Sequence, residues 1–401
     1  MERELPACYA LAMAPDLACP HRPPCPGCPR YGEPGIAPAA AALLEAIARE
    51  TGLPPPAVIE GAAFGHRHRA RLMVRGRARS PKIGIFEAGT HAIVDIPRCH
   101  VHHPLVNTVA GALRDAIRAT GTRPYAERTH TGVLRAVQIV VERSSQTAQV
   151  VLVANATTTD PIADLAAALA DRLGERLHSL WWNGNPERSN TILGSSWRHL
   201  RGPDAVCERV CGAPVFFPPG AFGQSHLELA EALVARVHEW VPDAVQVAEY
   251  YAGCGPIGLG LLARAARVVF IESATDAVRG LAMGIAARPE SEQRRASVIG
   301  GLAGEAQSAS DGAQVVIVDP PRRGLDAALA LRLAADPPPL LIYVSCDLHS
   351  FRRDAAQLVA GGALKLVALE AWSLFPNTEH VETLARFERV RGPARVTAES
   401  E

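Results

Sequence analysis

The stretch AVQVAEYYAGCGPIGLGLLARAARVVFIES, residues 244–273, decides the fold, because it runs from a strand through a glycine-rich turn and a helix into a second strand. Its turn, GCGPIG at residues 253–258, fits the pattern G-x-G-x-x-G. Glycines allow the backbone to turn tightly and to approach a ligand closely. Glu272, at the end of the second strand, is placed to accept hydrogen bonds from a ribose diol. The stretch therefore predicts a nucleotide-binding unit that suits a nicotinamide cofactor and S-adenosylmethionine (SAM) equally well.

The alternation of strands and helices extends over residues 206–401. A helical pattern at 226–240 precedes the glycine-rich turn, and the strand-like runs AQVVIVDPP, LLIYVSC and LKLVALEAW follow it. Helical patterns separate these runs. Strands that alternate with helices indicate a doubly wound, mostly parallel sheet, so we predict an α/β domain here.

The first half of the chain is organised differently. Residues 61–205 contain strand-like runs with helices at about 104–119 and 161–174, which predicts an α+β domain with a mostly antiparallel sheet. Residues 1–60 begin with a segment rich in proline and cysteine and continue with a helix at 38–50. We therefore expect three parts: a cysteine segment with its helix at 1–60, a central domain at 61–205 and the α/β domain at 206–401.

The composition is that of an ordinary globular protein. Hydrophobic residues make up 48% of the chain, and 41 basic residues balance 41 acidic ones. No run approaches the roughly 18 apolar residues of a membrane-spanning helix. The apolar patch at 7–15 follows Glu2, Arg3 and Glu4 and lacks the basic start of a signal peptide. We expect a monomeric, cytoplasmic protein without a membrane partner.

The distribution of charge is more informative than its sum. No acidic residue lies between Glu60 and Glu87, and six arginines there occupy odd positions: Arg67, Arg69, Arg71, Arg75, Arg77 and Arg79. Odd positions share one face of an extended strand. A solvated charged face is one explanation, but side chains of one sign repel one another. We therefore predict a phosphate-binding surface that contacts RNA.

The stretch VVIVDPPRRG, residues 315–324, distinguishes the two cofactors. A strand ends on Asp319, and two prolines stiffen the loop that carries it. An Asp-Pro-Pro loop at this place resembles the fourth motif of nucleic-acid methyltransferases, which lies between the cofactor and the target base. A dehydrogenase gives this loop no role. The loop therefore favours a SAM-dependent methyltransferase.

Three motifs make the resemblance more specific: DPPRRG at 319–324, YVSCD at 343–347 and HVETLARF at 380–387. With FFPPGAFGQSH at 216–226, they resemble the RNA uracil-C5 methyltransferase family over most of the chain. The resemblance implies a Rossmann-like methyltransferase domain that forms 5-methyluridine in rRNA or tRNA. It implies Cys346 as nucleophile and Glu382 as general base, with Glu379 as a nearby rival. The SAM contacts that it implies are Gln224, Tyr251, Gly253, Gly255, Glu272 and Asp319.

Uracil methylation needs one thiol and one base, because uracil C5 is too weak a nucleophile to take a methyl group from SAM unaided. Attack of a thiolate at C6 turns C5 into an enolate carbon, which can displace the methyl group from the sulfonium. A base must then remove the C5 proton so that the cysteine is expelled. The target base must leave its stack to reach both groups.

The nine cysteines are unevenly distributed, with Cys8, Cys19, Cys25 and Cys28 near the amino end. An odd number in a chain without an export signal argues against a disulfide framework. The resemblance implies that Cys19, Cys25, Cys28 and the distant Cys99 bind a [4Fe-4S] cluster, as in the branch without an N-terminal β-barrel RNA-binding module. Four thiolates also suit zinc, but zinc sites usually pair two short C-x₂₋₄-C units. The single C-x₂-C unit favours iron, with Cys8 as a spare candidate ligand.

Two positions depart from the family pattern. The chain has Asp347-Leu348 where Asn-Pro is usual after the cysteine, and His226 where an Asn is common. Because of both departures, the sequence does not determine the local loop geometry. The nearest enzyme alternative is an amino-group or a cytosine-C5 methyltransferase. Amino-group enzymes typically have an aromatic residue after Asp/Asn-Pro-Pro, where this chain has Arg322. RNA cytosine-C5 enzymes usually carry another cysteine in the Pro-Cys loop, where residues 319–324 contain none. The second alternative is an RNA-binding relative without activity, against which Cys346 and Glu382 argue.

Overall fold

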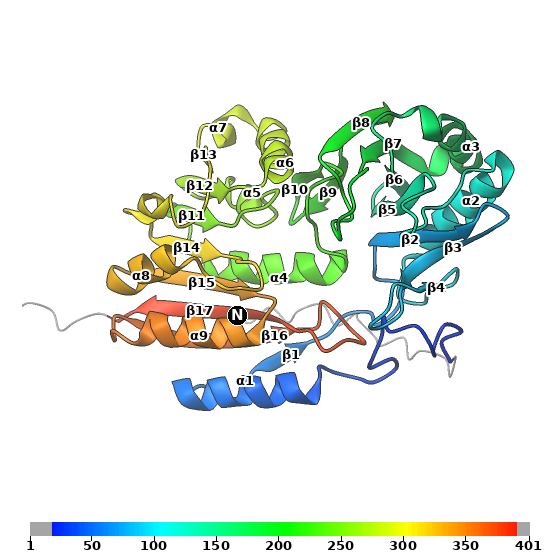
Figure 1. The fold of residues 1–401 in the computed structure, drawn as a ribbon. Helices are drawn as coiled ribbons and strands as arrows, with labels where there is room; N and C mark the ends of the chain where they lie inside the picture. The colour runs from blue at the N-terminus through cyan, green and yellow to red at the C-terminus, as the bar shows by residue number, and fades with distance from the viewer. Residues whose placement is uncertain (1–17, 391–401) are drawn as a thin grey trace, which may run out of the picture.

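The computed structural model describes residues 18–390, which form two parts lying side by side (Figure 1). One part is a large sheet with helices on both faces, and the other is a smaller sheet with helices on one face. Cys8, the spare candidate ligand, lies outside the described residues. Within residues 18–390, no helix is long and apolar enough to cross a membrane.

The larger sheet confirms the predicted doubly wound α/β topology. Its strand order is β1-β16-β17-β15-β14-β11-β12-β13. Neighbouring strands are parallel, except that β17 runs antiparallel to both β15 and β16. The strands are β1 (Ala57–Ile59), β11 (Gln246–Tyr250), β12 (Arg267–Glu272), β13 (Ala296–Gly300), β14 (Val315–Val318), β15 (Leu340–Ser345), β16 (Leu364–Trp372) and β17 (Glu382–Arg389).

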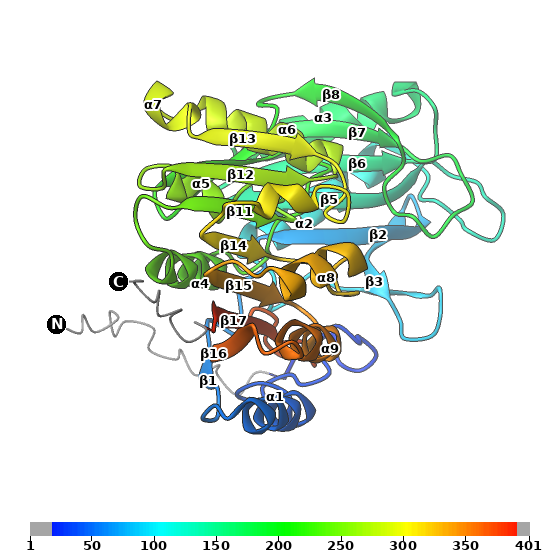
Figure 2. The same cartoon turned by 90° about the vertical axis from the view of Figure 1, so that its left-hand side faces the viewer.

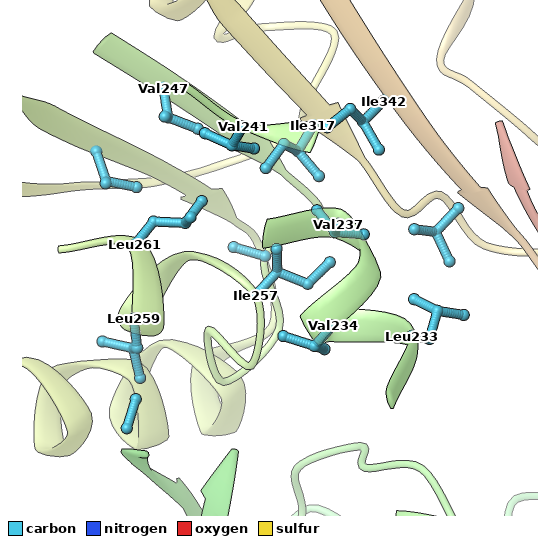
Figure 3. Close-up of a cluster of buried hydrophobic side chains, with 14 of the residues drawn as sticks. Leu233, Val234, Val237, Val241, Val247, Ile257, Leu259, Leu261, Ile317 and Ile342 are labelled. Atoms are coloured by element: carbon cyan, nitrogen blue, oxygen red, sulfur yellow. The ribbon is translucent and has the colours of Figure 1, made fainter. Parts of the chain in front are cut away.

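Helices cover both faces of this sheet because its central strands present apolar side chains to each side. Figure 3 shows Val237 of α4 and the strand residues Ile317 and Ile342 in one buried cluster. On the opposite face, Tyr250 and Tyr343 pack in a second core with α1, α8 and α9. The helices are α1 (Pro38–Thr51), α4 (Leu227–Trp240), α5 (Gly258–Leu261), α6 (Thr275–Ala286), α7 (Glu290–Gln293), α8 (Ala327–Ala335) and α9 (Leu348–Val359).

The amino-terminal helix and strand belong to this larger sheet, which corrects the boundary predicted at residue 60. Strand β1 pairs in parallel with β16, from Ala57 opposite Glu370 to Ile59 opposite Trp372. Leu44 of α1 is buried in the core that α1 shares with α9. Residues 38–59 therefore complete the C-terminal α/β domain instead of standing apart with the cysteine segment.

The smaller sheet confirms the predicted central α+β domain. Its order is β4-β3-β2-β5-β6-β7-β8, and only β6 and β7 are parallel. Helices α2 and α3 cover one face, where Leu72 and Val74 of β2 are buried. The other face carries a small apolar cluster that includes Met73 and Trp181. The elements are β2 (Arg69–Arg77), β3 (Ser80–Phe86), β4 (Ile93–Asp95), α2 (Pro104–Thr120), β5 (Leu134–Glu142), β6 (Thr147–Ala154), α3 (Ala163–Leu173), β7 (Leu177–Gly184) and β8 (Ser196–Arg201).

A hairpin joins the two parts. It consists of β9 (Val206–Val210) and β10 (Ala213–Phe217), and it contacts β5 on one side and α6 on the other. Arg279 of α6 lies over the ring of Trp181 in β7 and forms an ion pair with Asp204 at 3.3 Å. These contacts hold α6 beside the smaller sheet, as the two perpendicular views show (Figure 1, Figure 2).

Candidate active site

Strands β15 and β17 bring Cys346 and Glu382 together. The antiparallel register pairs Ser345 with Thr383, so the next residue outward on each segment is Cys346 and Glu382. The Thr383 hydroxyl donates a hydrogen bond to the Ser345 carbonyl at 3.1 Å, which ties the two strand ends together. The predicted nucleophile and the predicted base therefore lie at one edge of the sheet.

Burial distinguishes Glu382 from Glu379, the other candidate for the general base. Glu379 is exposed, whereas only 1% of Glu382 is accessible. Within the described chain, the Oε2 atom of Glu382 has no hydrogen-bond partner. Burial, reinforced by the nearby Asp319 carboxylate, raises the pKa of Glu382 well above its ordinary value. A higher pKa makes the ionised carboxylate a stronger base, so Glu382 is the residue suited to accept a proton.

The Cys346 thiol is half-buried among acidic groups. Burial raises its pKa to about 11, and the charges of Glu382 and Asp319 act in the same direction. Arg322 opposes them and lowers the pKa of both Cys346 and Glu382. Arg322 is exposed on the Asp-Pro-Pro loop, 3.4 Å from the Nε2 atom of His380. It is thus the positive charge that favours the thiolate, and the sequence argument did not select it.

Asp347 begins helix α9. Its carboxylate accepts a hydrogen bond from the Ser350 backbone N–H at 2.8 Å, as an N-cap residue does. His226, the other departure from the family pattern, caps α4 in the same way, accepting from the Leu229 N–H at 3.4 Å. Asparagine is also a favoured N-cap residue. Both substitutions therefore keep the capping function.

The glycine-rich turn leaves open space above the sheet. Gly253 and Gly255 have φ of +56° and +79°, in the region that favours glycine. A Cβ on Gly253 would meet no atom within 4 Å, whereas one on Gly255 would lie 2.6 Å from Leu281 Cδ1. Gly255 is thus required for packing on α6, and Gly253 borders room for a ligand.

Two carboxylates face this turn. The Gly253 N–H donates to Glu272 Oε2 at 2.8 Å, and the N–H groups of Ser273 and Ala274 donate to Oε1 at 2.8 and 2.7 Å. These bonds orient Glu272 at the end of β12. Burial, followed by the charge of Glu272, raises the pKa of Asp319 to about 7. The turn, Glu272 and Asp319 therefore form one acidic cluster beside Glu382.

Tyr251 borders the same region, and the loop that precedes Gln224 approaches it from α6. The Tyr251 hydroxyl accepts a hydrogen bond from the Asp326 N–H at 2.9 Å, which joins the turn to the end of the Asp-Pro-Pro loop. The loop before Gln224 lies against the start of α6, because a Cβ on Gly220 would lie 1.9 Å from Asp276 Oδ2. The structure thus gathers Tyr251, Gly253, Gly255, Glu272 and Asp319 around β11, β12 and β14. Gln224 lines a small pocket with His68 and Arg69.

Glu249 is a buried acid that the sequence argument missed. It lies in β11 beneath the turn, and a Cβ on Gly258 would come within 2.1 Å of its Oε2 atom. Burial, followed by the charge of Asp319, raises its pKa to about 8. The sequence did contain a signal for Glu249, namely an acidic residue inside the apolar run VQVAEYY. A buried carboxylate is rare without a role in binding or structure.

Asp354 is a second buried acid that was missed, and it holds the Asp-Pro-Pro loop against α9. Its carboxylate accepts hydrogen bonds from the Tyr343 hydroxyl and from the Leu325 N–H, both at 2.7 Å. Tyr343 lies in the strand that ends at Cys346, and Leu325 follows the loop that carries Arg322. Asp354 therefore fixes the loop relative to the nucleophile.

The four predicted cluster cysteines lie in one neighbourhood. Burial raises the pKa of Cys28 to about 11, and the Cys99, Cys25 and Cys19 thiols add to the rise. Arg67 lowers the pKa of both Cys28 and Cys99. Burial raises the pKa of Cys99, and the nearby backbone N–H groups of His102 and Val101 oppose this rise. In the described part of the chain, however, no three His, Cys, Asp or Glu side chains are arranged so that they could hold a metal ion.

The odd-numbered arginines are divided between internal contacts and solvent. Arg69 donates to the Ala221 carbonyl at 2.8 Å, and Arg75 donates to the Arg135 carbonyl at 2.8 Å while stacking over Tyr125. These contacts hold the domains and the sheet together. The exposed arginines of the set are Arg71, Arg77 and Arg79, of which Arg71 also donates to the Gln138 side-chain oxygen at 2.7 Å.

Comparison with known proteins agrees with this geometry, although no protein-family model matches the chain. An uncharacterised RNA methyltransferase of Protochlamydia amoebophila is 34% identical over 381 residues, which cover 93% of this chain and 98% of the relative. Another, from Gloeobacter violaceus, is 32% identical, and the alignment covers 83% of this chain and 72% of the relative. The crystal structure of Pyrococcus abyssi tRNA (uracil-54, C5)-methyltransferase with S-adenosyl-L-homocysteine has a TM-score of 0.72 at 25% identity, covering 86% of this chain and 80% of that one.

The fold and these relatives define a methyltransferase with a Rossmann-like, SAM-binding domain. The chain belongs to the RNA methyltransferases, and it is similar in structure to a uracil-C5 enzyme of that class.

Proposed function

We propose that this protein methylates C5 of a uridine in tRNA or rRNA, with SAM as the methyl donor and a covalent bond between Cys346 and uracil C6 as the intermediate. The observation that carries the proposal is the meeting of Cys346 and Glu382 beside Asp319 at one sheet edge. One thiol and one buried base on the same side of a ring are what this reaction requires. The Pyrococcus abyssi protein is named for uracil 54 of tRNA, which makes tRNA the first substrate to test.

The reaction begins when the Cys346 thiolate attacks C6. The new S–C6 bond moves electrons into an enolate, and C5 then attacks the methyl group of SAM. The C–S bond of the sulfonium breaks and S-adenosylhomocysteine is released. Glu382 removes the C5 proton, and the electrons of that C–H bond restore the C5–C6 double bond while the thiolate leaves. Arg322 supports the first step, because its charge favours the thiolate.

The proposed cofactor site uses the open space beside Gly253. A ribose diol would be held by Glu272, whose carboxylate is oriented by three backbone N–H groups. Asp319 and Gln224 would contact the rest of SAM. The exposed Arg71, Arg77 and Arg79 would contact RNA phosphates and position the substrate.

We also propose that Cys19, Cys25, Cys28 and Cys99 hold a [4Fe-4S] cluster. The chemistry of the donor set supports such a group, since the other three thiols raise the pKa of Cys28 and Arg67 favours the thiolate forms. In the described residues these side chains are not arranged around a metal ion. The cluster would act as a structural cross-link between the amino-terminal segment and the central domain. No step of methyl transfer depends on it.

The methylation proposal is tested with substitutions at the two reacting groups. Cys346→Ala should abolish transfer of labelled methyl from SAM to RNA taken from cells that lack the gene. Glu382→Gln should methylate C5 but retain the proton, so that a protein–RNA adduct survives a denaturing gel. Glu379→Gln is the matched control, because Glu379 is exposed and three residues away, and it should turn over normally. Full turnover by Cys346→Ala, or product without 5-methyluridine, would reject the proposal.

A further inference from the structure

A hollow of about 250 Å³ lies at the far end of β2, away from the methyl-transfer site. It lies between the end of β2, where β3 follows, and the segment that connects α2 to β5. The residues that line it are Gly76, Arg77, Ala78, Arg123, Pro124, Thr131 and Gly132. Nothing in the proposed reaction uses this hollow.

The walls of the hollow are fixed by backbone contacts. Gly132 packs so closely on the opposite segment that a Cβ there would lie 2.2 Å from the Pro124 carbonyl oxygen. The Tyr125 N–H donates to the Leu134 carbonyl, and the Val133 N–H donates to the Arg123 carbonyl, both at 2.8 Å. The hollow is therefore a preformed feature of the fold, which lowers the cost of ordering a ligand in it.

Two guanidinium groups border the hollow without a partner. Across residues 18–390, the guanidinium groups of Arg77 and Arg123 form no hydrogen bond and no ion pair, although the backbone of both residues is hydrogen-bonded or paired. The nearest acid in the same segment, Glu127, is already engaged by His91 at 3.0 Å and by Arg75 at 3.7 Å. By contrast, Arg69, Arg71 and Arg75 on the same strand have internal acceptors. Arg77 and Arg123 are thus free to bind an anion.

We infer that this hollow binds a phosphate group of the RNA backbone, with Arg77 and Arg123 as its donors. The inference rests on the proposed function, since it takes the ligand to be the substrate RNA. A planar guanidinium offers paired N–H donors that match phosphate oxygens. Thr131 is the third polar residue of the lining, and its hydroxyl shares a hydrogen bond with the Thr129 hydroxyl at 2.8 Å. Pro124 and Ala78 add apolar surface to the hollow.

The position of the hollow assigns it to a nucleotide remote from the target. Arg69, at the start of β2, donates to Ala221, three residues before Gln224. Arg77 ends the strand eight residues later, and at about 3.3 Å per residue the separation is about 26 Å along β2. The phosphate contact should therefore increase RNA affinity without affecting the chemistry at the reacting base.

The test is the double variant Arg77→Ala/Arg123→Ala in the full-length protein. Filter binding of a labelled 30-nucleotide RNA stem–loop should become about tenfold weaker, since charged hydrogen bonds are lost. The slope of log K against log salt should fall by about one, as expected for one phosphate. With RNA from cells that lack the gene, KM for RNA should rise while kcat at saturation stays unchanged.

The matched control is Arg172→Ala/Arg176→Ala, which removes the same charge at the end of α3, the helix that covers the opposite face of the sheet. It should leave affinity and salt slope nearly unchanged, and thermal unfolding should confirm that both doubles are folded. An equal loss of RNA affinity in both double variants would mean a general charge effect and would overturn the inference. Unchanged RNA binding by Arg77→Ala/Arg123→Ala would overturn it as well. Competition by inorganic phosphate that weakens the wild type and the variant equally would also refute it. If the wild type formed no 5-methyluridine, the proposed function would fail, but the filter-binding comparison would still decide the phosphate site.

Discussion

At the scale of single residues, the site depends on three groups that are partly or fully buried and on one exposed guanidinium beside them. Burial raises the pKa values of Cys346, Glu382 and Asp319, because the charged forms lose hydration. Arg322 is the group that lowers the pKa of two of them. Reactivity at this edge therefore depends on the balance between three acidic groups and one guanidinium.

The reactivity of Cys346 should accordingly rise with pH and depend on Arg322. A thiol with a pKa of about 11 is almost wholly protonated at pH 7, so its thiolate fraction should increase about tenfold per pH unit up to pH 9. Arg322→Ala should slow alkylation of Cys346 by iodoacetamide at pH 8 about three- to tenfold, because the thiol pKa rises further. Mass spectrometry of the peptide containing Cys346 measures the rate.

The control for this experiment is Arg323→Ala. Arg323 is the adjacent exposed arginine on the same loop, and it is not among the main groups that shift the pKa of Cys346. In the Arg323→Ala variant, Cys346 should be alkylated at the wild-type rate. Identical rates for the two variants would show that Arg322 does not promote the thiolate.

At the scale of elements, helix ends and strand ends place the functional groups. Strand β15 ends immediately before Cys346, and helix α9 begins immediately after Asp347. Asp354 of α9 then binds both Tyr343 and the end of the Asp-Pro-Pro loop. The nucleophile thus sits in a short connection whose two ends and facing loop are all fixed, which limits its freedom before substrate binds.

The capping role of Asp347 leads to a prediction about stability. Asp347→Ala should remove the acceptor for the Ser350 N–H and destabilise the α/β domain by about 1 kcal/mol. The midpoint of thermal unfolding should fall by about 2–4 °C. Asp347→Asn should unfold within a degree of the wild type, because asparagine caps equally well. If both variants lost the same stability, the negative charge rather than the cap would be what matters.

At the scale of the whole molecule, distant segments are joined at two places. Strand β1 adds an edge to the C-terminal sheet, and the segment containing Cys19–Cys28 meets the loop containing Cys99. The Arg98 N–H also donates to the His21 ring at 3.2 Å across this second junction. Both junctions fasten the amino-terminal segment to the body of the protein.

Loss of the proposed cluster should therefore loosen the amino-terminal segment. Protein purified without oxygen should be brown and contain about four irons and four sulfides per chain. Cys99→Ser should lose the colour and make the segment around residues 19–28 more sensitive to limited proteolysis. Cys207→Ser is the control, since Cys207 lies in the β9–β10 hairpin, and it should retain the iron. Colourless protein with stoichiometric zinc would refute the cluster.

Local patterns predicted most of the fold. Helices at 38–51, 104–120 and 227–240 lie within two residues of their expected bounds, because amphipathic periodicity and the prolines and glycines at their ends are local signals. The arginine pattern predicted that Arg69 and Arg75 share one face of a strand that contacts RNA, but it did not reveal their internal acceptors. Those acceptors, Ala221 and Arg135, come from other parts of the chain, so no spacing within 67–79 could indicate them.

The sequence by itself determined the α/β class, the glycine-rich turn and the order of the motifs that carry Asp319, Cys346 and Glu382. Those features depend on short-range periodicity and on residue types with narrow chemical roles. Only the tertiary structure decided that Glu382 rather than Glu379 is buried, and that β1 joins the C-terminal sheet. Burial and strand pairing depend on which distant segments meet, and that information is not present in any local stretch of residues.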